Sequence, residues 1–149
     1  MADWRLRYLG LSRYAALEWS KDPSTKVGAV IYRPNGTPVS HGYNGFPQKI
    51  ADTPERLNDR ELKYQIILHA EMNAFIFAEG DIAGNYLCTW PFLPCPRCAV
   101  VFIQAGIVGV TAPILPGRLR ERWEDSIRLS INLFIEAGVE VHTLDYPTE

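Results

Sequence analysis

Apolar residues recur at helical spacing near the start of the chain. Intervals of three and four residues separate Trp4, Tyr8, Leu11, Ala15 and Trp19. Asp3 stands just before this stripe, where an N-cap residue is favoured. The pattern predicts an amphipathic helix that ends near Ser20 and turns the stripe toward the core.

Short runs rich in β-branched residues predict five strands. Residues 27–32 and 39–43 flank a Pro-Asn-Gly turn at 34–36, which is typical of a hairpin. The remaining three runs lie at 86–90, 107–111 and 139–142. The tail that follows the last run is expected to fray.

Three further helices separate the later strands. We expect them at 66–78, at 98–105 and along the apolar stripe 119–134, which Gly138 ends. The first of these is apolar on nearly every side, so it should be buried. Residues 48–63 are polar and charged, and they predict a surface loop that could contain a short helical turn.

The predicted order of elements defines an α/β fold. A helix comes first, an antiparallel hairpin follows, and each later strand is preceded by a helix. Helical crossovers favour parallel pairing, so the sequence predicts a mixed five-stranded sheet with helices on both faces, a three-layer sandwich. At 149 residues, the chain is expected to form one domain, residues 1–149.

Composition argues against several classes of protein. The chain has 15 basic and 17 acidic residues and a formal net charge of −2, so the overall charge gives no reason to expect a nucleic-acid partner. No apolar run is long enough to span a membrane, and residues 1–5 do not resemble a signal peptide. Three cysteines, two of them close together, favour metal ligation in a reducing compartment, and we expect a cytoplasmic protein.

Two short motifs carry the candidate chemistry. Residues 69–71 read His-Ala-Glu, and residues 94–98 read Pro-Cys-Pro-Arg-Cys. Zinc takes four ligands, and a catalytic zinc keeps one position for water. Three protein ligands are available in His69, Cys95 and Cys98. Glu71 is the additional carboxylate, suited to carrying protons beside the metal.

Each motif alone is also compatible with a different role. A Cys-x-x-Cys pair also suits a redox dithiol, or a structural zinc with Cys88 as the fourth ligand. A lone His69 would more often be a buried histidine than a ligand. Both motifs together favour a catalytic zinc, because two helix N-termini can then meet at one ion. A non-enzymatic interaction domain held by zinc remains an alternative only if Glu71 is unnecessary.

The expected chemistry follows from charge. A bound zinc lowers the pKa of its water toward about 7. Two thiolates weaken that effect, so a nearby general base is needed. Glu71 can take the proton of the attacking water and pass it to a ring nitrogen and then to the leaving amine. The predicted reaction is hydrolysis of an exocyclic amine with release of ammonia.

The pairing of H-x-E with P-C-x-x-C marks the zinc deaminases. With these residues the chain resembles the cytidine deaminase superfamily and, more closely, the deoxycytidylate (dCMP) deaminase family. The resemblance extends over nearly the whole chain and includes residues 20–29, 42–47, 63–64, 69–74, 94–98 and 103–107. The first two of these stretches are the ones that indicate the dCMP branch.

The resemblance implies an activity and a set of site residues. It implies hydrolytic deamination of dCMP to dUMP, which feeds thymidylate synthesis, with one zinc held by His69, Cys95 and Cys98 and with Glu71 as proton carrier. It also implies contacts of Asn44 with the sugar, of the backbone near Ala70 with the pyrimidine, and of the loop from Ser24 to Lys26 with the phosphate.

The resemblance further implies assembly and regulation. Members of the family are commonly hexamers, although a dimer is an alternative here. They are often activated by dCTP and inhibited by dTTP together with Mg²⁺. The loop associated with that regulation contains Gly42, Tyr43 and Gly45.

Two departures from the family pattern bear on the substrate. The stretch before the second motif is bulkier and includes Trp90, Phe92 and Pro94, which could reshape the base pocket. Residues 111–118 replace a tyrosine-bearing acidic stretch, so Arg118 or Arg120 could supply a phosphate contact instead. The substrate could therefore be another free nucleotide, nucleoside or base, including a modified cytosine or guanine. Editing of tRNA or single-stranded DNA is disfavoured, because the charge is nearly neutral.

Overall fold

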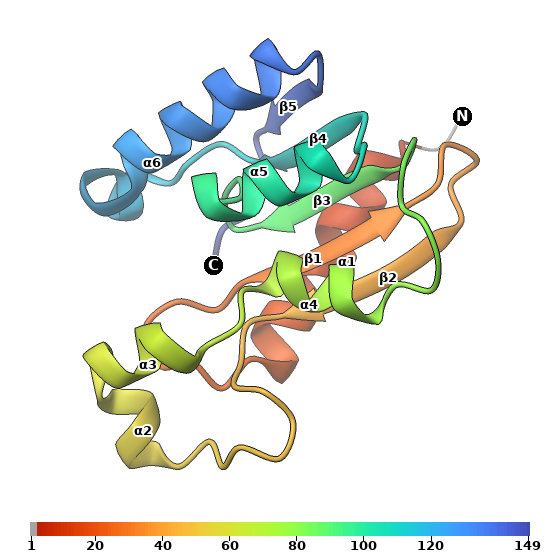
Figure 1. Ribbon diagram of the computed structural model, residues 1–149. Coiled ribbons are helices and arrows are strands. Elements are labelled where there is room, and N and C mark those ends of the chain that lie inside the picture. Colours follow the sequence, from red (N-terminus) through yellow and green to blue (C-terminus); the bar gives the residue numbers. More distant parts are fainter. Residues whose placement is uncertain (1–2) are drawn as a thin grey trace.

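A mixed five-stranded sheet organises the chain in the computed structural model, which describes residues 3–149 (Figure 1). The strands are β1 (Gly28–Tyr32), β2 (Pro38–Tyr43), β3 (Tyr86–Trp90), β4 (Gly109–Pro113) and β5 (Glu140–Leu144), in the spatial order β2-β1-β3-β4-β5. β1 pairs antiparallel with both β2 and β3, whereas β3, β4 and β5 pair in parallel. The predicted mixed sheet is confirmed.

Helices cover both faces of the sheet and make the three layers (Figure 1). They are α1 (Trp4–Trp19), α2 (Pro54–Asn58), α3 (Arg60–Ile66), α4 (Ala70–Phe77), α5 (Pro96–Gln104) and α6 (Gly117–Glu136). Side chains alternate along a strand. In β1, therefore, Ala29 and Ile31 join the main core with α4, α5 and α6, while Val30 and Tyr32 pack with Tyr8 of α1 on the opposite face.

The predicted buried face of α1 is wrong at several positions. Trp4, Leu11 and Trp19 are exposed, and the buried face consists of Tyr8, Leu9, Ser12, Ala15 and Ala16. The reason is a close approach to the sheet, because a Cβ on Gly28 would lie 1.9 Å from the Ser12 carbonyl oxygen. Small residues fit this contact, and the large aromatic side chains lie at its margins.

The segment between β2 and α4 also differs from the expectation. Residues 54–66 form two short helices, α2 and α3, whose first turns are capped by Thr53 and Asp59. The expected helix 66–78 begins only at Ala70, because Leu68 forms an isolated β-bridge with Gly45. At its other end Ile76 and Phe77 are 53% and 56% exposed, so the expectation of complete burial is wrong.

The C-terminal tail is held in place instead of frayed. The indole Nε1 of Trp90 donates to the Pro147 carbonyl at 2.7 Å, and Arg118 donates to the Thr148 hydroxyl at 3.2 Å. Among the described residues, no helix combines the length and apolar character needed to cross a membrane.

Candidate active site

Three side chains with metal-ligand atoms meet between α4 and α5. His69 is the N-cap residue of α4, Cys95 is the N-cap residue of α5, and Cys98 lies in the first turn of α5. The Nδ1 atom of His69 is 3.5 Å from the Cys95 sulfur and 3.3 Å from the Cys98 sulfur. Zinc bonds of about 2.0–2.1 Å to nitrogen and about 2.3 Å to sulfur, at a tetrahedral angle, separate the two donors by about 3.5 Å. The donor set and its spacing therefore fit one zinc ion.

This cluster is the only candidate metal group that we find within residues 3–149. The alternative of a structural zinc with Cys88 as fourth ligand is wrong. Cys88 is buried on the face of the sheet that packs against α1, where its sulfur lies 3.9 Å from the Arg5 carbonyl. Because α4 and α5 cover the opposite face, the Cys88 thiol cannot reach the other three donors.

The cluster is electrostatically prepared for a cation. A hydrogen bond from the Cys98 thiol, with further help from His69, lowers the pKa of Cys95 to about 4, and the same partnership raises the pKa of Cys98. The hydrogen bond with Cys95 also raises the pKa of His69, because it favours the imidazolium. A cation that binds here replaces these protons, since zinc ligands are thiolates and neutral imidazole.

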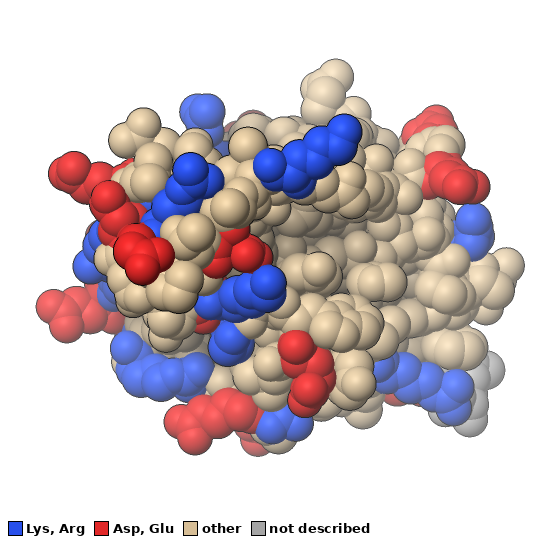
Figure 2. Space-filling model, turned by 90° about the horizontal axis from the view of Figure 1, so that it is seen from below, with Lys and Arg blue, Asp and Glu red and all other residues tan. Residues whose placement is uncertain are grey.

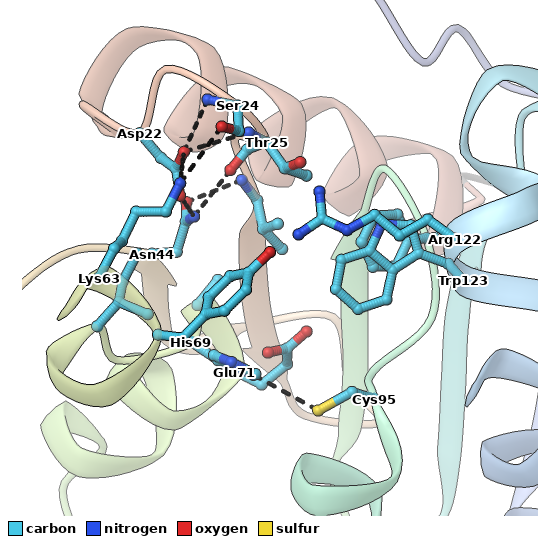
Figure 3. Close-up of a pocket in the computed structure, with 15 residues that line it drawn as sticks. Asp22, Ser24, Thr25, Asn44, Lys63, His69, Glu71, Cys95, Arg122 and Trp123 are labelled. Carbon is cyan, nitrogen blue, oxygen red and sulfur yellow. Dashed lines mark hydrogen bonds and ion pairs between the residues drawn. The ribbon is translucent and has the colours of Figure 1, made fainter. Parts of the chain in front are cut away.

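Glu71 is a buried carboxyl group in the first turn of α4. Its residue is only 4% exposed. Burial raises the pKa of Glu71, and the neighbouring His69 opposes that change in part. Its carboxyl group lies beside His69 and Cys95 in the same cavity (Figure 3). A carboxyl group with a raised pKa at this place can hold and return a proton.

One cavity connects this cluster with a second group of polar residues (Figure 3). Its inner end is formed by His69, Ala70, Glu71 and Cys95, and its remaining walls by Asp22, Ser24, Thr25, Val27, Asn44, Lys63, Tyr64, Ile67, Phe92, Arg122 and Trp123. Of the predicted substrate residues, Ser24, Asn44 and Ala70 thus line the same cavity as the zinc cluster and Glu71. Figure 2 shows Lys and Arg interspersed among Asp and Glu over the face of the molecule that it draws.

A buried ion pair holds one wall of the cavity. Lys63 Nζ lies 3.1 Å from Asp22 Oδ1, and their side chains are only 3% and 7% exposed. Asp22 also accepts hydrogen bonds from the backbone N–H groups of Ser24 and Thr25 at 2.8 and 3.3 Å. This pair was missed at the sequence level, although residues 63–64 were among the stretches that carried the resemblance.

The Asn44 amide is fully hydrogen-bonded inside the protein. Its oxygen accepts from the Ser20 hydroxyl at 2.7 Å and from the Val27 N–H at 2.9 Å. Its NH₂ group donates to the Thr25 carbonyl at 2.9 Å and to Asp22 at 3.3 Å. Asn44 therefore fixes the wall in this structure, and its contact with a sugar stays a prediction.

The outer wall contains Phe92, which the sequence predicted near the base pocket, together with Arg122 and Trp123, which sequence reasoning missed. The ring of Phe92 stacks on Trp123 with 5.1 Å between centroids. The Arg122 guanidinium lies 4.8 Å from the Trp123 ring centroid and 5.7 Å from that of Tyr64. Arg122 and Trp123 had only the charged and apolar pattern of an amphipathic helix, so no local signal distinguished them.

Three predicted substrate residues lie outside this cavity. Trp90 is only 2% exposed, with its indole bonded to the tail, and Pro94 is fully buried, so neither lines the cavity. Lys26 also lies outside it, because its ammonium donates to the Ser20 carbonyl. Arg118 is bound to the tail instead of the cavity. The predicted regulatory residues Gly42, Tyr43 and Gly45 line a separate surface groove beside Ile76 and Phe77.

Comparison with known proteins gives these features a context. Residues 2–112 match the model of the cytidine and deoxycytidylate deaminase zinc-binding region. An Aliivibrio fischeri protein named "uncharacterized deaminase in luxG 3' region" is 41% identical over 95% of this chain and 93% of its own length. Mouse deoxycytidylate deaminase is 35% identical in an alignment that covers 70% of this chain and 61% of the mouse protein.

A solved structure agrees with the fold. The dCMP deaminase of cyanophage S-TIM5, in complex with dCMP and dUMP, matches with a TM-score of 0.72 and 25% identity, over 93% of this chain and 95% of the phage protein. The sheet, its helical layers and the His-Cys-Cys cluster define a zinc-binding deaminase. The chain belongs to the cytidine and deoxycytidylate deaminase family, whose members are hydrolases acting on C–N bonds.

Proposed function

We propose that this protein deaminates dCMP hydrolytically to dUMP and ammonia. The observation that carries the proposal is a single cavity with two different ends. Glu71 and the donor cluster of His69, Cys95 and Cys98 lie at one end, and the Arg122 guanidinium lies toward the other. A pyrimidine amine directed to the first end would leave the phosphate of a nucleotide near the second.

The protein groups have distinct roles in this reaction. His69, Cys95 and Cys98 hold the zinc, and the chemistry that a bound zinc supplies is activation of water as a nucleophile. Glu71 takes one proton from that water and delivers it to the ring nitrogen next to the attacked carbon. The water oxygen bonds to that ring carbon, Glu71 then carries the second water proton from the new hydroxyl group to the exocyclic amine, the C–N bond breaks and ammonia leaves. Water and the cytosine ring are thereby converted to a uracil ring and ammonia.

Two relatives support dCMP as the substrate. The mouse relative is named deoxycytidylate deaminase, and the phage structure contains dCMP and dUMP. The name of the Aliivibrio relative states no substrate. On the face shown in Figure 2, Lys and Arg are interspersed among Asp and Glu and do not form the continuous basic stripe that a polynucleotide groove needs.

The proposal extends to organisation and regulation. Residues 1–149 act as one deaminase domain in the cytoplasm, and copies of the chain associate as a homo-oligomer. The groove lined by Gly42, Tyr43 and Gly45, next to the exposed Ile76 and Phe77, is a suitable surface for that association. Control by dCTP, or by dTTP with Mg²⁺, at this loop stays a prediction.

The test is ammonia release by purified, zinc-loaded protein. The substrates would be dCMP, CMP, deoxycytidine, 5-methyl-dCMP, cytosine and guanine, each with and without dCTP and Mg²⁺. We expect dCMP to be the preferred substrate. Preference for a nucleoside or a base would replace dCMP with that substrate, and no release from any member of the panel would overturn the deaminase proposal for free nucleotides.

A further inference from the structure

Arg122 is an arginine without an anionic partner at the wall of the cavity. It comes from α6, far in sequence from both zinc motifs, and its guanidinium packs over the rings of Trp123 and Tyr64. Within residues 3–149, no carboxylate forms an ion pair with Arg122, and its guanidinium donates no hydrogen bond. Figure 3 shows its guanidinium extending over the cavity on the side of Thr25, away from Cys95.

The two lysines near this wall both have partners inside the protein. Lys63 lines the cavity, but Asp22 neutralises it at 3.1 Å, and it also donates to the Ser24 hydroxyl at 3.3 Å. Lys26 is directed to the Ser20 carbonyl and does not line the cavity. Arg122 is therefore the cation of this wall whose donors remain available to a ligand.

Neutral donors face the same space. Ser24 and Thr25 line the cavity, and the backbone hydrogen bonds to Asp22 fix the turn that presents them. Lys63 donates to the Ser24 oxygen, so the Ser24 hydroxyl proton is free to be donated elsewhere. A guanidinium and two hydroxyl groups are suitable partners for a tetrahedral oxyanion.

We propose that Arg122, opposite Ser24 and Thr25, binds the phosphate monoester of the substrate and makes the enzyme selective for a nucleotide over a nucleoside. This inference rests on the proposed function, because the cavity must first accept a cytosine-type ring at the Glu71 end. It assigns the phosphate contact to α6 instead of to Lys26.

The physical case is the uncompensated charge. Arg122 is exposed, and no carboxylate within residues 3–149 forms an ion pair with it. Burial and the nearby Arg60 lower the pKa of Arg122, and Asp22 opposes that change. A phosphate would supply the missing anion, and the planar fork of arginine can bind two phosphate oxygens at once. The rings of Tyr64 and Trp123 hold the guanidinium by stacking, which limits the freedom lost on binding.

The experiment compares dCMP with deoxycytidine in the zinc-loaded protein and in R122Q, R122K and R128Q. R128Q is the matched control, because Arg128 lies on the same helix, is exposed and pairs with Glu124 at the surface. We expect R122Q to lower kcat/KM for dCMP roughly 10- to 100-fold, as for lost hydrogen bonds to a charged group. Its kcat/KM for deoxycytidine should stay unchanged. R122K should recover part of the loss, and R128Q should behave as the wild type.

The outcomes separate the two proposals. Equal use of dCMP and deoxycytidine by the wild type, or an equal loss in R122Q and R128Q, would overturn the role of Arg122 and leave deamination standing. Absence of deamination from every substrate would overturn the proposed function instead. Calorimetric titration of dCMP and deoxycytidine into zinc-loaded E71Q gives a readout without turnover. We expect the double variant E71Q/R122Q to bind dCMP more weakly than E71Q does and to bind deoxycytidine equally well. Equal binding of dCMP by the two proteins would contradict the inference.

Discussion

The two ends of the cavity are built in different ways. At the inner end His69 and Glu71 come from one helix start, and Cys95 and Cys98 come from another, so each segment spans only a few residues. At the outer end, the wall is assembled from the turn 22–25, from Lys63 and from Arg122, which lie far apart in sequence.

The inner end of the cavity holds the groups proposed for the reaction, and the outer end holds the groups proposed to recognise the substrate. The inner geometry is set by two helical first turns packed on a common sheet, so local backbone geometry fixes the relative positions of the reacting groups. The outer geometry depends on long-range contacts, above all the buried pair of Asp22 and Lys63. We therefore expect substitutions at the inner end to remove activity and substitutions at the outer end to change stability or substrate preference.

The largest effect should follow removal of the metal. Dialysis against a zinc chelator should abolish ammonia release, and added zinc should restore it, because the proposed mechanism requires a Lewis acid to activate water. Metal content measured by elemental analysis should fall and recover together with activity. Circular dichroism before and after chelation serves as the control for folding. Full activity in protein shown to contain no metal would contradict the assignment of His69, Cys95 and Cys98.

Replacement of the carboxyl group at the inner end should have the next largest effect. E71Q keeps the size of the side chain but removes its proton transfer, so kcat should fall about 10²- to 10⁴-fold. Zinc content should be unchanged, since Glu71 is not one of the three proposed ligands. The matched control is E79Q at an exposed position, which should retain wild-type activity. Full activity in E71Q would show that the proposed role of Glu71 as proton carrier is wrong.

At the outer end, breaking the buried ion pair should mainly reduce stability. K63M leaves the Asp22 carboxylate buried without its partner, which typically costs about 3–5 kcal/mol of unfolding free energy. The comparison is K21M, because Lys21 pairs with Asp52 at 3.0 Å while their side chains are 67% and 44% exposed, and exposed pairs contribute about 0–1 kcal/mol. Urea denaturation of both variants measures the difference. Equal losses would show that burial of the pair does not matter.

The smallest predicted effect concerns the contact that positions the inner end. A Cβ on Gly42 would lie 2.4 Å from the Ala70 carbonyl oxygen and 2.5 Å from the Ala74 nitrogen. G42A should therefore push α4 from the sheet and cost about 1–3 kcal/mol of stability, as overpacking does. A Cβ on Gly45 would meet only the Tyr43 ring, at 4.0 Å, so G45A should change stability by less than about 0.5 kcal/mol. Similar melting temperatures for the two variants would contradict this distinction.

The sequence was sufficient for the sheet and for the metal cluster. Five β-branched runs were predicted close to their observed places, and the separate motifs around His69 and Cys95 pointed to one zinc site. Both kinds of signal are local: a strand shows itself in a few consecutive residues, and metal ligands have distinctive chemistry at fixed spacing.

The outer wall could not be predicted, for a physical reason. Lys63 lies in a polar segment that predicted a surface loop, and only the folded chain brings it to Asp22. Arg122 lies on the charged side of an amphipathic helix, where most arginines face solvent. The buried face of α1 was missed for a similar reason, because the close approach at Gly28 is a property of two elements together.

The placement of Trp123 gives the cavity an optical probe of its own. Its indole lines the cavity, its buried Nε1 has no hydrogen-bond partner among the described residues, and it stacks on Phe92. A ligand that reaches the outer wall changes the polarity around this ring, so intrinsic fluorescence should respond to occupancy without any label. The other three tryptophans, Trp4, Trp19 and Trp90, do not line this cavity, so their emission forms the background. W123F, which keeps an aromatic ring against Phe92, identifies the part of the signal that comes from the cavity.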